Sequence, residues 1–373
     1  MKKLGILFFG FALLLTGCQE DQGYYLSGSV EGMEDGKKVY ISERDETTRS
    51  LKAIDTTTIE NGKFKIDMED TDLPGLSFLQ FEGVNGNVVF ISENERINFD
   101  INKDSLRNAK ITGGKENEAL KEYLDHLKEL NEKMLGLQQK IRQAAIDRNS
   151  EELNNIRGAK AELIDNDKNY KEELYKRNTD SYVGVMLLTD MLNMKSHSAP
   201  EVKDMFAELS DRLKKTPLAK SLEENLDNNL AVEVGSKAPT FTAPNPDGEQ
   251  LSLNENLGKV TVVDFWAAWC KPCRIENPNL VKTYNKYKDQ GLNIISVSLD
   301  RPGQKDRWIK AIEEDNLEQW SHVSNLKFWN EPVAKKYQVK AIPATFILDE
   351  NGVIVAKNLR GDALADKIGE LLN

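Results

Sequence analysis

Two cysteines, Cys270 and Cys273, stand three residues apart, directly after an apolar stretch of the chain. That stretch, Val260 to Trp266, is rich in β-branched and aromatic residues and holds one acid, Asp264. Such a run is typical of a buried strand. The residues after Cys270 have helical spacing that continues through Tyr284. Two thiols at the start of a helix lie within one turn, close enough for their sulfurs to bond.

The position of the first thiol favours its reactivity. Unpaired N–H groups and the helix dipole favour negative charge at a helix N-terminus, so we expect Cys270 to ionise more easily than a free cysteine. Thiol–disulfide exchange requires at least an accessible thiolate and a second thiol close to it.

Two other interpretations of the cysteine pair are weaker. A zinc site needs about four ligands, and only His322 and carboxylates remain nearby. A static disulfide that closes so short a loop restrains little of the unfolded chain. The spacing therefore predicts a redox pair, and we expect neither a metal nor a cofactor.

The motifs around this pair resemble a thioredoxin fold. They are D-F-W-A-A-W-C-K-P-C at residues 264–273 and A-I-P-A-T-F at residues 341–346. Ahead of them, V-G-S-K-A-P-T-F at residues 234–241 is similar to the membrane-attached ResA/TlpA branch of that superfamily. The resemblance covers residues 233–373, where it implies a thioredoxin-like domain.

The resemblance also implies roles for individual residues. Cys270 is the attacking thiol, Cys273 is the buried resolving thiol, and Pro343 matches the cis-proline that faces them. Because proline has no N–H, Ile342 is expected to offer its backbone to an extended substrate segment. Trp269, beside Cys270, is expected at the surface rim of the site, where substrate binds.

Two acids complete the expected site. Asp264 matches the buried acid of thioredoxin, where ResA-like members more often carry asparagine. Burial should raise the pKa of Asp264, which would then exchange protons with Cys273 near neutral pH. Glu276 matches the acid of the C-x-x-C-x-x-E-x-P pattern, and a carboxylate one turn past the thiols opposes their ionisation. The alternatives are a structural carboxylate for Asp264 and a solvated side chain for Glu276.

Composition limits the class of protein. The chain has 373 residues, a formal net charge of −11 and 30% charged residues. This length suggests two to three domains. The acidic balance argues against a nucleic-acid partner, which would need a basic face. Cys18 is the only other cysteine, so no pair remains for a structural disulfide.

Residues 1–18 have the pattern of an export signal. Lys2 and Lys3 precede an apolar stretch from Leu4 to Leu15 that is too short to span a bilayer. The next residues, Leu15-Thr16-Gly17-Cys18, resemble the lipobox of bacterial lipoproteins, which implies that Cys18 is acylated and becomes the mature N-terminus. Its acyl chains would hold the protein on a membrane. The alternative is an ordinary cleaved signal, with Cys18 near the cut by chance.

Residues 19–112 contain alternating runs separated by glycine turns. Three dipeptides are typical of hairpin turns: Asp35-Gly36, Asn61-Gly62 and Asn85-Gly86. The runs lie at residues 38–42, 64–68, 76–81, 88–91 and 97–101. This spacing predicts an all-β sandwich or barrel. It resembles a small β-domain of unassigned function that precedes thioredoxin domains in Gram-negative lipoproteins. Its charged residues most simply form solvated faces, and a docking or ligand face is the alternative.

Residues 113–232 change to a helical period. Apolar residues between Leu120 and Ala144 recur every three or four positions, which predicts a helix of about 30 residues. Asn149 with Glu152 fits a capping box for a second helix. We expect an antiparallel hairpin, then shorter helices at residues 183–194 and 202–213, with residues 217–234 leading into the last domain. A dimeric coiled coil is the alternative.

The predicted fold is multidomain, with an all-β N-terminal domain, an α-helical middle and an α/β thioredoxin-like C-terminal domain. We expect a membrane-anchored, periplasm-facing thiol–disulfide oxidoreductase that reduces protein disulfides through Cys270 and Cys273. By the resemblance, its partners are disulfide-containing proteins and a membrane thiol electron donor, in a role similar to cytochrome c biogenesis. Its place is the cell envelope, with the outer membrane as one candidate.

Two other functions fit parts of the sequence. A binding lipoprotein would use the first 230 residues and keep the redox domain as an accessory. A thiol peroxidase is suggested by the similarity of residues 234–241 to peroxiredoxins. The peroxidatic T-x-x-C arrangement is absent from the sequence, however, and W-C-K-P-C stands in its place.

Overall fold

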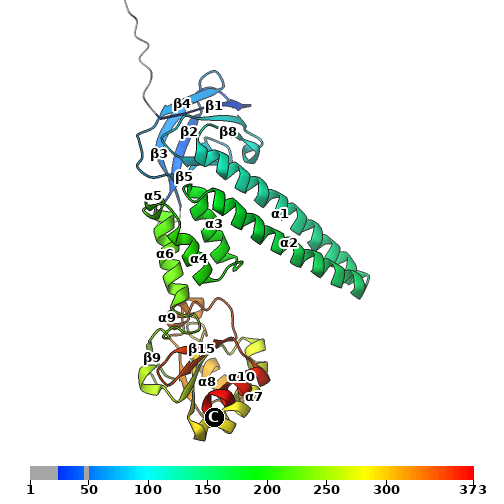
Figure 1. Cartoon of the computed structure of the whole chain (residues 1–373), viewed down its shortest axis with the longest axis vertical. Coiled ribbons are helices and arrows are strands. Elements are labelled where there is room, and N and C mark those ends of the chain that lie inside the picture. The colour runs from blue at the N-terminus through cyan, green and yellow to red at the C-terminus, as the bar shows by residue number, and fades with distance from the viewer. Residues whose placement is uncertain (1–23, 46–49) are drawn as a thin grey trace, which may run out of the picture. The chain divides into compact units, whose positions relative to one another are not determined.

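The computed structural model describes residues 24–45 and 50–373 (Figure 1). The predicted signal and its Cys18 lie outside the described residues. The described chain divides into two compact units. One runs to Leu187 and includes Leu209–Thr216, and the other comprises Leu188–Glu208 and Pro217–Asn373. Across residues 24–45 and 50–373, no helix is both long enough and apolar enough to cross a membrane.

The first unit begins with two four-stranded sheets, of order β4-β1-β7-β8 and β3-β2-β5-β6. Their elements are β1 (Tyr25–Glu31), β2 (Lys38–Arg44), β3 (Leu51–Thr58), β4 (Lys63–Asp67), β5 (Gly75–Phe81), β6 (Val88–Ser92), β7 (Ile97–Asn102), η1 (Leu106–Asn108) and β8 (Lys110–Thr112). Alternate residues of β7 are buried, and inward side chains of both sheets share one core. The predicted all-β domain is confirmed.

Two of the three predicted hairpins are wrong. Only Asn85-Gly86 joins neighbouring strands, β5 and β6. Asp35-Gly36 connects β1 to β2, and Asn61-Gly62 connects β3 to β4; each of these pairs belongs to different sheets. Asn61 and Gly62 do have the positive φ angles of a tight turn, 52° and 69°. Turn residues set the local backbone, whereas the sheet that a strand joins depends on where its apolar face is buried.

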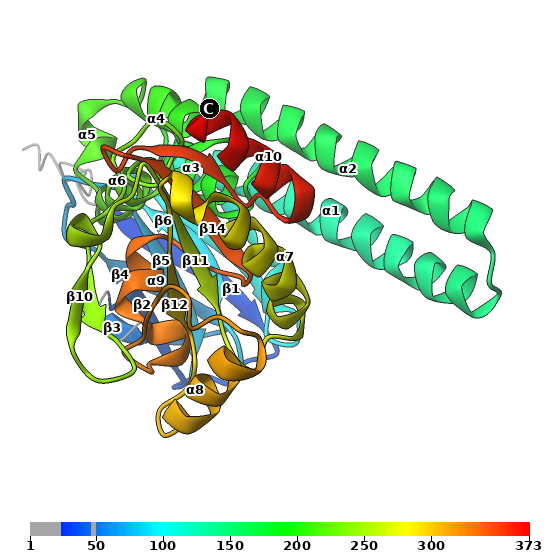
Figure 2. The same cartoon turned by 90° about the horizontal axis from the view of Figure 1, so that it is seen from below.

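Two long helices follow, α1 (Lys115–Ile146) and α2 (Ser150–Arg177), and they lie side by side as the predicted hairpin (Figures 1 and 2). Gly113 allows the entry into α1, because it has φ 87° and a Cβ there would lie 2.0 Å from the Arg96 carbonyl oxygen. At the start of α2, the Asn149 side chain accepts a 3.0 Å hydrogen bond from Glu152 N, which is one half of the predicted capping box.

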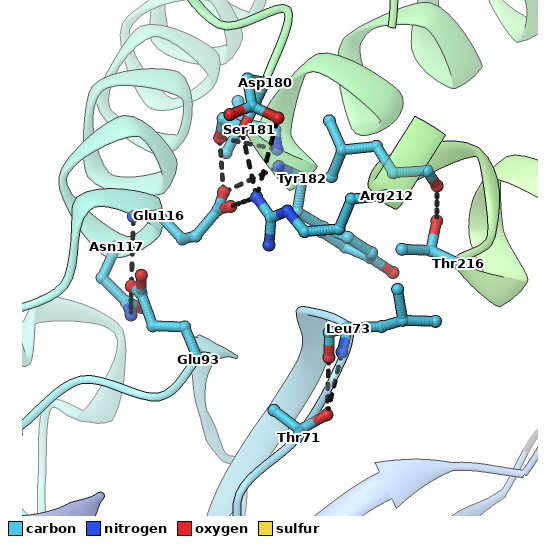
Figure 3. A network of polar contacts seen from close by, with 12 residues as sticks. Thr71, Leu73, Glu93, Glu116, Asn117, Asp180, Ser181, Tyr182, Arg212 and Thr216 are labelled. Carbon is cyan, nitrogen blue, oxygen red and sulfur yellow. Dashed lines mark hydrogen bonds and ion pairs between the residues drawn. The ribbon is translucent and has the colours of Figure 1, made fainter. Parts of the chain in front are cut away.

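A buried network of polar contacts fixes the N-termini of α1 and α3 (Tyr182–Asn193) (Figure 3). Glu93 accepts hydrogen bonds from Glu116 N (3.1 Å) and from the Asn117 side chain (3.2 Å) at the start of α1. Glu116 in turn accepts from Ser181 Oγ (2.6 Å) and from Tyr182 N (2.7 Å) at the start of α3. Carboxylates therefore cap both helices, as their dipoles favour.

Three helices follow α3: α4 (Ala199–Ala207), α5 (Asp211–Lys214) and α6 (Pro217–Leu230). The single helix predicted at residues 202–213 is wrong, because Ser210 is extended (ψ 151°) and separates α4 from α5. The segment from Pro217 was predicted only as a connection, yet it forms α6. Proline suits the first position of a helix, and Leu222 and Leu226 are buried.

The C-terminal domain contains a five-stranded sheet of order β13-β12-β11-β14-β15. A separate two-stranded sheet is formed by β9 and β10. The elements of this domain are β9 (Thr242–Pro244), β10 (Gln250–Ser252), η2 (Asn254–Asn256), β11 (Val260–Trp266), α7 (Lys271–Tyr287), η3 (Lys288–Gln290), β12 (Leu292–Ser298), α8 (Lys305–Glu314), β13 (Ser321–Val323), η4 (Phe328–Asn330), α9 (Pro332–Lys336), β14 (Ala344–Asp349), β15 (Ile354–Lys357) and α10 (Gly361–Leu372). Helices α7 and α10 pack together (Figure 2). The predicted thioredoxin-like α/β fold is confirmed.

Strand register decides which residues are the neighbours of Asp264 and which end of the sheet lies near Cys270. Strand β11 is buried along its whole length, with β12 parallel on one side and β14 antiparallel on the other. Asp264 therefore lies between Ser296 of β12 and Thr345 of β14. Because β14 runs antiparallel, its first residues lie beside the last residues of β11. Pro343, just before β14, thus lies at the end of the sheet where the chain leaves β11 for Cys270.

Candidate active site

The structure brings the two predicted thiols together as a disulfide at the N-terminus of α7. The Cys270 and Cys273 sulfurs are 2.02 Å apart. Cys270 is the N-cap residue, and its Sγ accepts a hydrogen bond from Cys273 N at 3.2 Å. Cys270 is 4% exposed and Cys273 is 1% exposed. In this oxidised state the first sulfur is therefore only slightly more accessible than the second, a smaller contrast than the sequence suggested.

A buried carboxylate holds the loop that leads into Cys270. Asp300, two residues after β12, is fully buried and accepts hydrogen bonds from Ala268 N (3.0 Å) and from Ser298 Oγ (2.7 Å). The indole N–H of Trp269 donates to the Leu299 carbonyl oxygen at 3.2 Å. The predicted rim residue Trp269 is half-buried. Sequence reasoning missed Asp300, although its place after a predicted buried strand was a usable signal.

Asp264 is buried in β11, as predicted, with 6% of its surface exposed. The pKa of Asp264 is raised to about 7, mainly by loss of water. A hydrogen bond from Ser296 opposes the rise, the negative charge of Glu276 adds to it, and the positive charge of Arg360 opposes it. A carboxyl group with this pKa can take up or release a proton at neutral pH.

Ser296 and Trp320 form a chain of hydrogen bonds to Asp264 that sequence reasoning missed. Ser296 Oγ donates to Asp264 Oδ2 at 3.2 Å, and Trp320 Nε1 donates to Ser296 Oγ at 3.0 Å. An indole N–H can only donate. It therefore directs the serine hydroxyl hydrogen toward the carboxylate, which favours the ionised form of Asp264.

Glu276 lies close enough to influence Asp264, but its own oxygens bind other groups. Its Oε1 accepts from Gly361 N at 2.6 Å, in the first turn of α10, and its Oε2 accepts from the Asn279 side chain at 3.1 Å. Glu276 therefore ties α7 to α10. Its effect on the site acts through its negative charge, which raises the pKa of Asp264.

Arg360, directly before α10, connects the predicted proline to the acids. Its guanidinium donates to the Pro343 carbonyl oxygen at 2.5 Å, and its charge lowers the pKa of Asp264. The Ile342–Pro343 bond is cis, as expected, with Pro343 buried and Ile342 half-buried. Sequence reasoning missed Arg360, because the contact joins segments that only the folded sheet places together.

The first turn of α7 is also held from outside the sheet. Arg274 forms an ion pair with Asp315, just after α8, and Asn277 donates to the same carboxylate at 2.6 Å. The contacts of Arg274 with Asp315 and with Glu314 raise the pKa of Arg274 above its ordinary value, so the guanidinium stays charged. The helix that carries the cysteines is therefore fixed by α8 and by α10.

Two family models and several known proteins match parts of this chain. The AhpC/TSA family matches residues 234–357, and a domain of unknown function (DUF4369) matches residues 24–120. The thiol-disulfide oxidoreductase ResA of Bacillus thuringiensis subsp. konkukian (strain 97-27) is 30% identical over 149 residues, which cover 38% of this chain and 78% of that protein. The thioredoxin-like protein YneN of Bacillus subtilis (strain 168) is 30% identical over 125 residues, 34% of this chain and 71% of that protein.

Among solved structures, the thioredoxin domain of a thiol-disulfide oxidoreductase from Bacteroides vulgatus is 42% identical, with a TM-score of 0.35, and the match covers 38% of this chain and 99% of that one. The extent of the match to ResA, together with the paired cysteines, settles the family. Through its C-terminal domain, the chain belongs to the AhpC/TSA family of thioredoxin-fold proteins, as a thiol-disulfide oxidoreductase related to ResA.

Proposed function

We propose that this protein is a membrane-anchored, periplasm-facing reductase of protein disulfides that works through the Cys270/Cys273 dithiol. One observation carries the proposal: a disulfide caps α7, and the strand that leads into it holds a buried acid whose pKa is about 7. That arrangement supplies a nucleophile, a resolving thiol and a group that moves protons at neutral pH.

In the first step, the Cys270 thiolate attacks one sulfur of a substrate disulfide. A bond forms between Cys270 Sγ and that sulfur, the substrate S–S bond breaks, and the second substrate sulfur leaves as a thiolate that takes up a proton. The N–H of Cys273 that now contacts Cys270 Sγ, together with the N-terminus of α7, favours the negative charge on the attacking sulfur.

In the second step, Cys273 resolves the mixed disulfide. Its thiol gives its proton to ionised Asp264, and the thiolate attacks Cys270 Sγ. The bond between Cys270 and the substrate breaks, and the substrate sulfur that Cys270 had bound is released and protonated. The substrate gains two electrons and two protons, and the protein is left with the Cys270–Cys273 disulfide. A membrane dithiol donor must then reduce that disulfide before another turnover.

The location in the cell envelope rests on the sequence. Lys2, Lys3, the apolar segment and the lipobox ending at Cys18 support export and a lipid anchor. The anchor and the thioredoxin-like domain together support action on exported proteins, in whose compartment disulfides form and persist.

Reduction of insulin by the dithiothreitol-reduced protein tests the activity, with peroxide consumption measured in parallel. We expect insulin reduction that is lost in Cys270→Ala, and peroxide consumption no faster than that of free thiols. Efficient peroxide consumption without insulin reduction would replace the reductase with a peroxidase.

A further inference from the structure

Three aromatic side chains form a cluster next to the disulfide, and we call it the aromatic shelf: Trp269, Phe328 and Trp329. Trp269 directly precedes Cys270, and the other two lie in η4. Ring centroids are 5.4 Å apart for Trp269 and Phe328, 6.2 Å for Trp269 and Trp329, and 5.8 Å for Phe328 and Trp329. Trp329 is 37% exposed. An exposed indole beside a reactive disulfide is a candidate contact surface.

The loop that carries Phe328 and Trp329 is fixed in an unfavourable backbone conformation. Leu326 and Phe328 have φ angles of 52° and 53°, in the left-handed region that bulky residues rarely adopt. Fully buried Glu331 holds the loop by accepting from Asn325 N (2.9 Å) and from the Asn325 side chain (2.7 Å). Such conformations persist only where the surrounding structure enforces them, and they concentrate at functional sites.

Asp300, which follows β12, holds both the loop that carries Trp269 and the loop that carries Phe328. Asp300 accepts from Ala268 N through its side chain and from Phe328 N through its backbone oxygen at 3.0 Å. Trp269 donates to the neighbouring Leu299. The shelf is therefore built as one rigid surface with the loop that presents Cys270.

Three basic residues lie next to the shelf in space or in sequence, although the whole chain carries a net charge of −11. The Arg301 guanidinium lies 4.4 Å from the centre of the Phe328 ring. Lys271 follows Cys270, Lys327 precedes Phe328, and both are exposed. Aromatic faces with cations around them suit a partner that combines apolar and acidic side chains.

We infer that the aromatic shelf binds an extended segment of the protein substrate, with a large apolar side chain near the reactive cysteine and an acidic side chain toward Arg301. The inference rests on the proposed function, because it places this segment beside the disulfide that is exchanged. Beyond the proposed function, the inference identifies the residues that select the substrate. Phe328, Trp329 and Arg301 would determine specificity without taking part in the exchange itself.

Binding of peptides without cysteine tests the shelf apart from the chemistry. The first peptide has serine in place of its reactive cysteine, with phenylalanine and glutamate nearby. A matched peptide also lacks the cysteine, and it has serine in place of the phenylalanine and lysine in place of the glutamate. Calorimetry with the full chain should show tighter binding of the first peptide. Trp329→Ala should weaken that binding about tenfold and Arg301→Gln about threefold. Neither substitution should weaken binding of the matched peptide.

Two controls make the outcomes distinct. Val234→Ala, at an exposed apolar residue outside the shelf, should bind both peptides as the wild type does. Trp329→Leu, which keeps an apolar side chain, should retain part of the affinity and rule out misfolding as the cause. Equal affinity of the wild type for the two peptides, or unchanged affinity in Trp329→Ala, would overturn the inference. Selective binding without any disulfide reduction would keep the shelf and refute the reductase instead.

Discussion

The Ser296 hydroxyl lies 3.2 Å from the Asp264 carboxylate and donates a hydrogen bond to it. Both residues are buried in adjacent parallel strands, β11 and β12. Burial is the main cause that raises the pKa of Asp264. The Ser296 hydrogen bond is the largest effect that opposes this rise, the charges of Glu276 and Arg360 add smaller effects of opposite sign, and the resulting pKa is about 7. A group balanced in this way can accept the Cys273 proton and release it again within the same pH range.

The first prediction is that Ser296→Ala raises the pKa of Asp264. Without the hydroxyl, the ionised carboxylate loses a donor that favours it. The pH at which mixed-disulfide resolution reaches half its maximal rate should move upward, and stopped-flow rates across pH 5–9 measure it. Ser296→Thr keeps the hydroxyl and should restore the wild-type profile. Identical profiles in wild type and Ser296→Ala would show that the hydrogen bond does not tune the acid.

The second prediction concerns Asp264→Asn, which should stabilise the fold and slow resolution. The pKa of Asp264 is about 7 when folded and near 3.8 when unfolded. The folded state therefore binds the proton more tightly, and wild-type stability falls as pH rises from about 4 to 7. This loss is on the order of 4 kcal/mol at most. Asp264→Asn has no acid at this position and so does not lose this stability as the pH rises. Its free energy of unfolding should therefore exceed that of the wild type at pH 8.

Denaturant unfolding at pH 4 and pH 8 measures this difference, which should shrink at the lower pH. Glu276→Gln is the matched comparison. It removes one charge that raises the pKa of Asp264 without removing the acid, so its effect on resolution should be weaker. If Asp264→Asn resolved mixed disulfides as fast as the wild type, Asp264 would be a structural carboxylate only.

The third prediction tests the polar network of the first unit (Figure 3). Burial and the charge of Glu116 raise the pKa of Glu93 to about 7, against hydrogen bonds from the start of α1 that lower it. Ionisation of Glu93 in the folded state is thus unfavourable, and its contribution to stability is lost as pH rises from 4.5 to 7. Glu93→Gln should therefore raise the midpoint of thermal unfolding at pH 8 more than at pH 5. An equal change at both pH values would contradict the assignment.

Much of the site could be predicted because its motifs are contiguous in the sequence. The apolar run of β11, the cysteine pair and Pro343 each lie in short segments whose local pattern defines their structure. Ser296, Trp320 and Arg360 were missed because they reach the site through strand register and side-chain contacts far apart in the chain. No local pattern encodes such contacts.

The fold shows the same division between local and distant information. Asn61-Gly62 predicted a tight turn correctly, but not that the turn joins two different sheets. The helix after Pro217 was missed because proline signals both a break and a helix start, and only the burial of Leu222 and Leu226 decides between them.

The fourth prediction concerns attachment to the membrane. Cys18→Ala removes the thiol that the lipobox presents for acylation, so the variant should leave the membrane fraction or remain unprocessed. Fractionation with metabolic labelling by a radioactive fatty acid measures this. Cys270→Ala, assayed beside it, should still be labelled. Labelled, membrane-bound protein in Cys18→Ala would refute the lipid anchor.

The exchange itself is tested most directly by trapping the mixed disulfide. Reduced Cys273→Ala should attack a substrate disulfide through Cys270 and stop there, because the resolving thiol is missing. Mass spectrometry of that variant with insulin, under non-reducing conditions, should show one added insulin chain on Cys270 that dithiothreitol removes. The control Cys270→Ala, which keeps Cys273, should form much less adduct. Equal adduct on both variants, or an unmodified Cys270 in Cys273→Ala, would contradict the assignment of Cys270 as the attacking thiol.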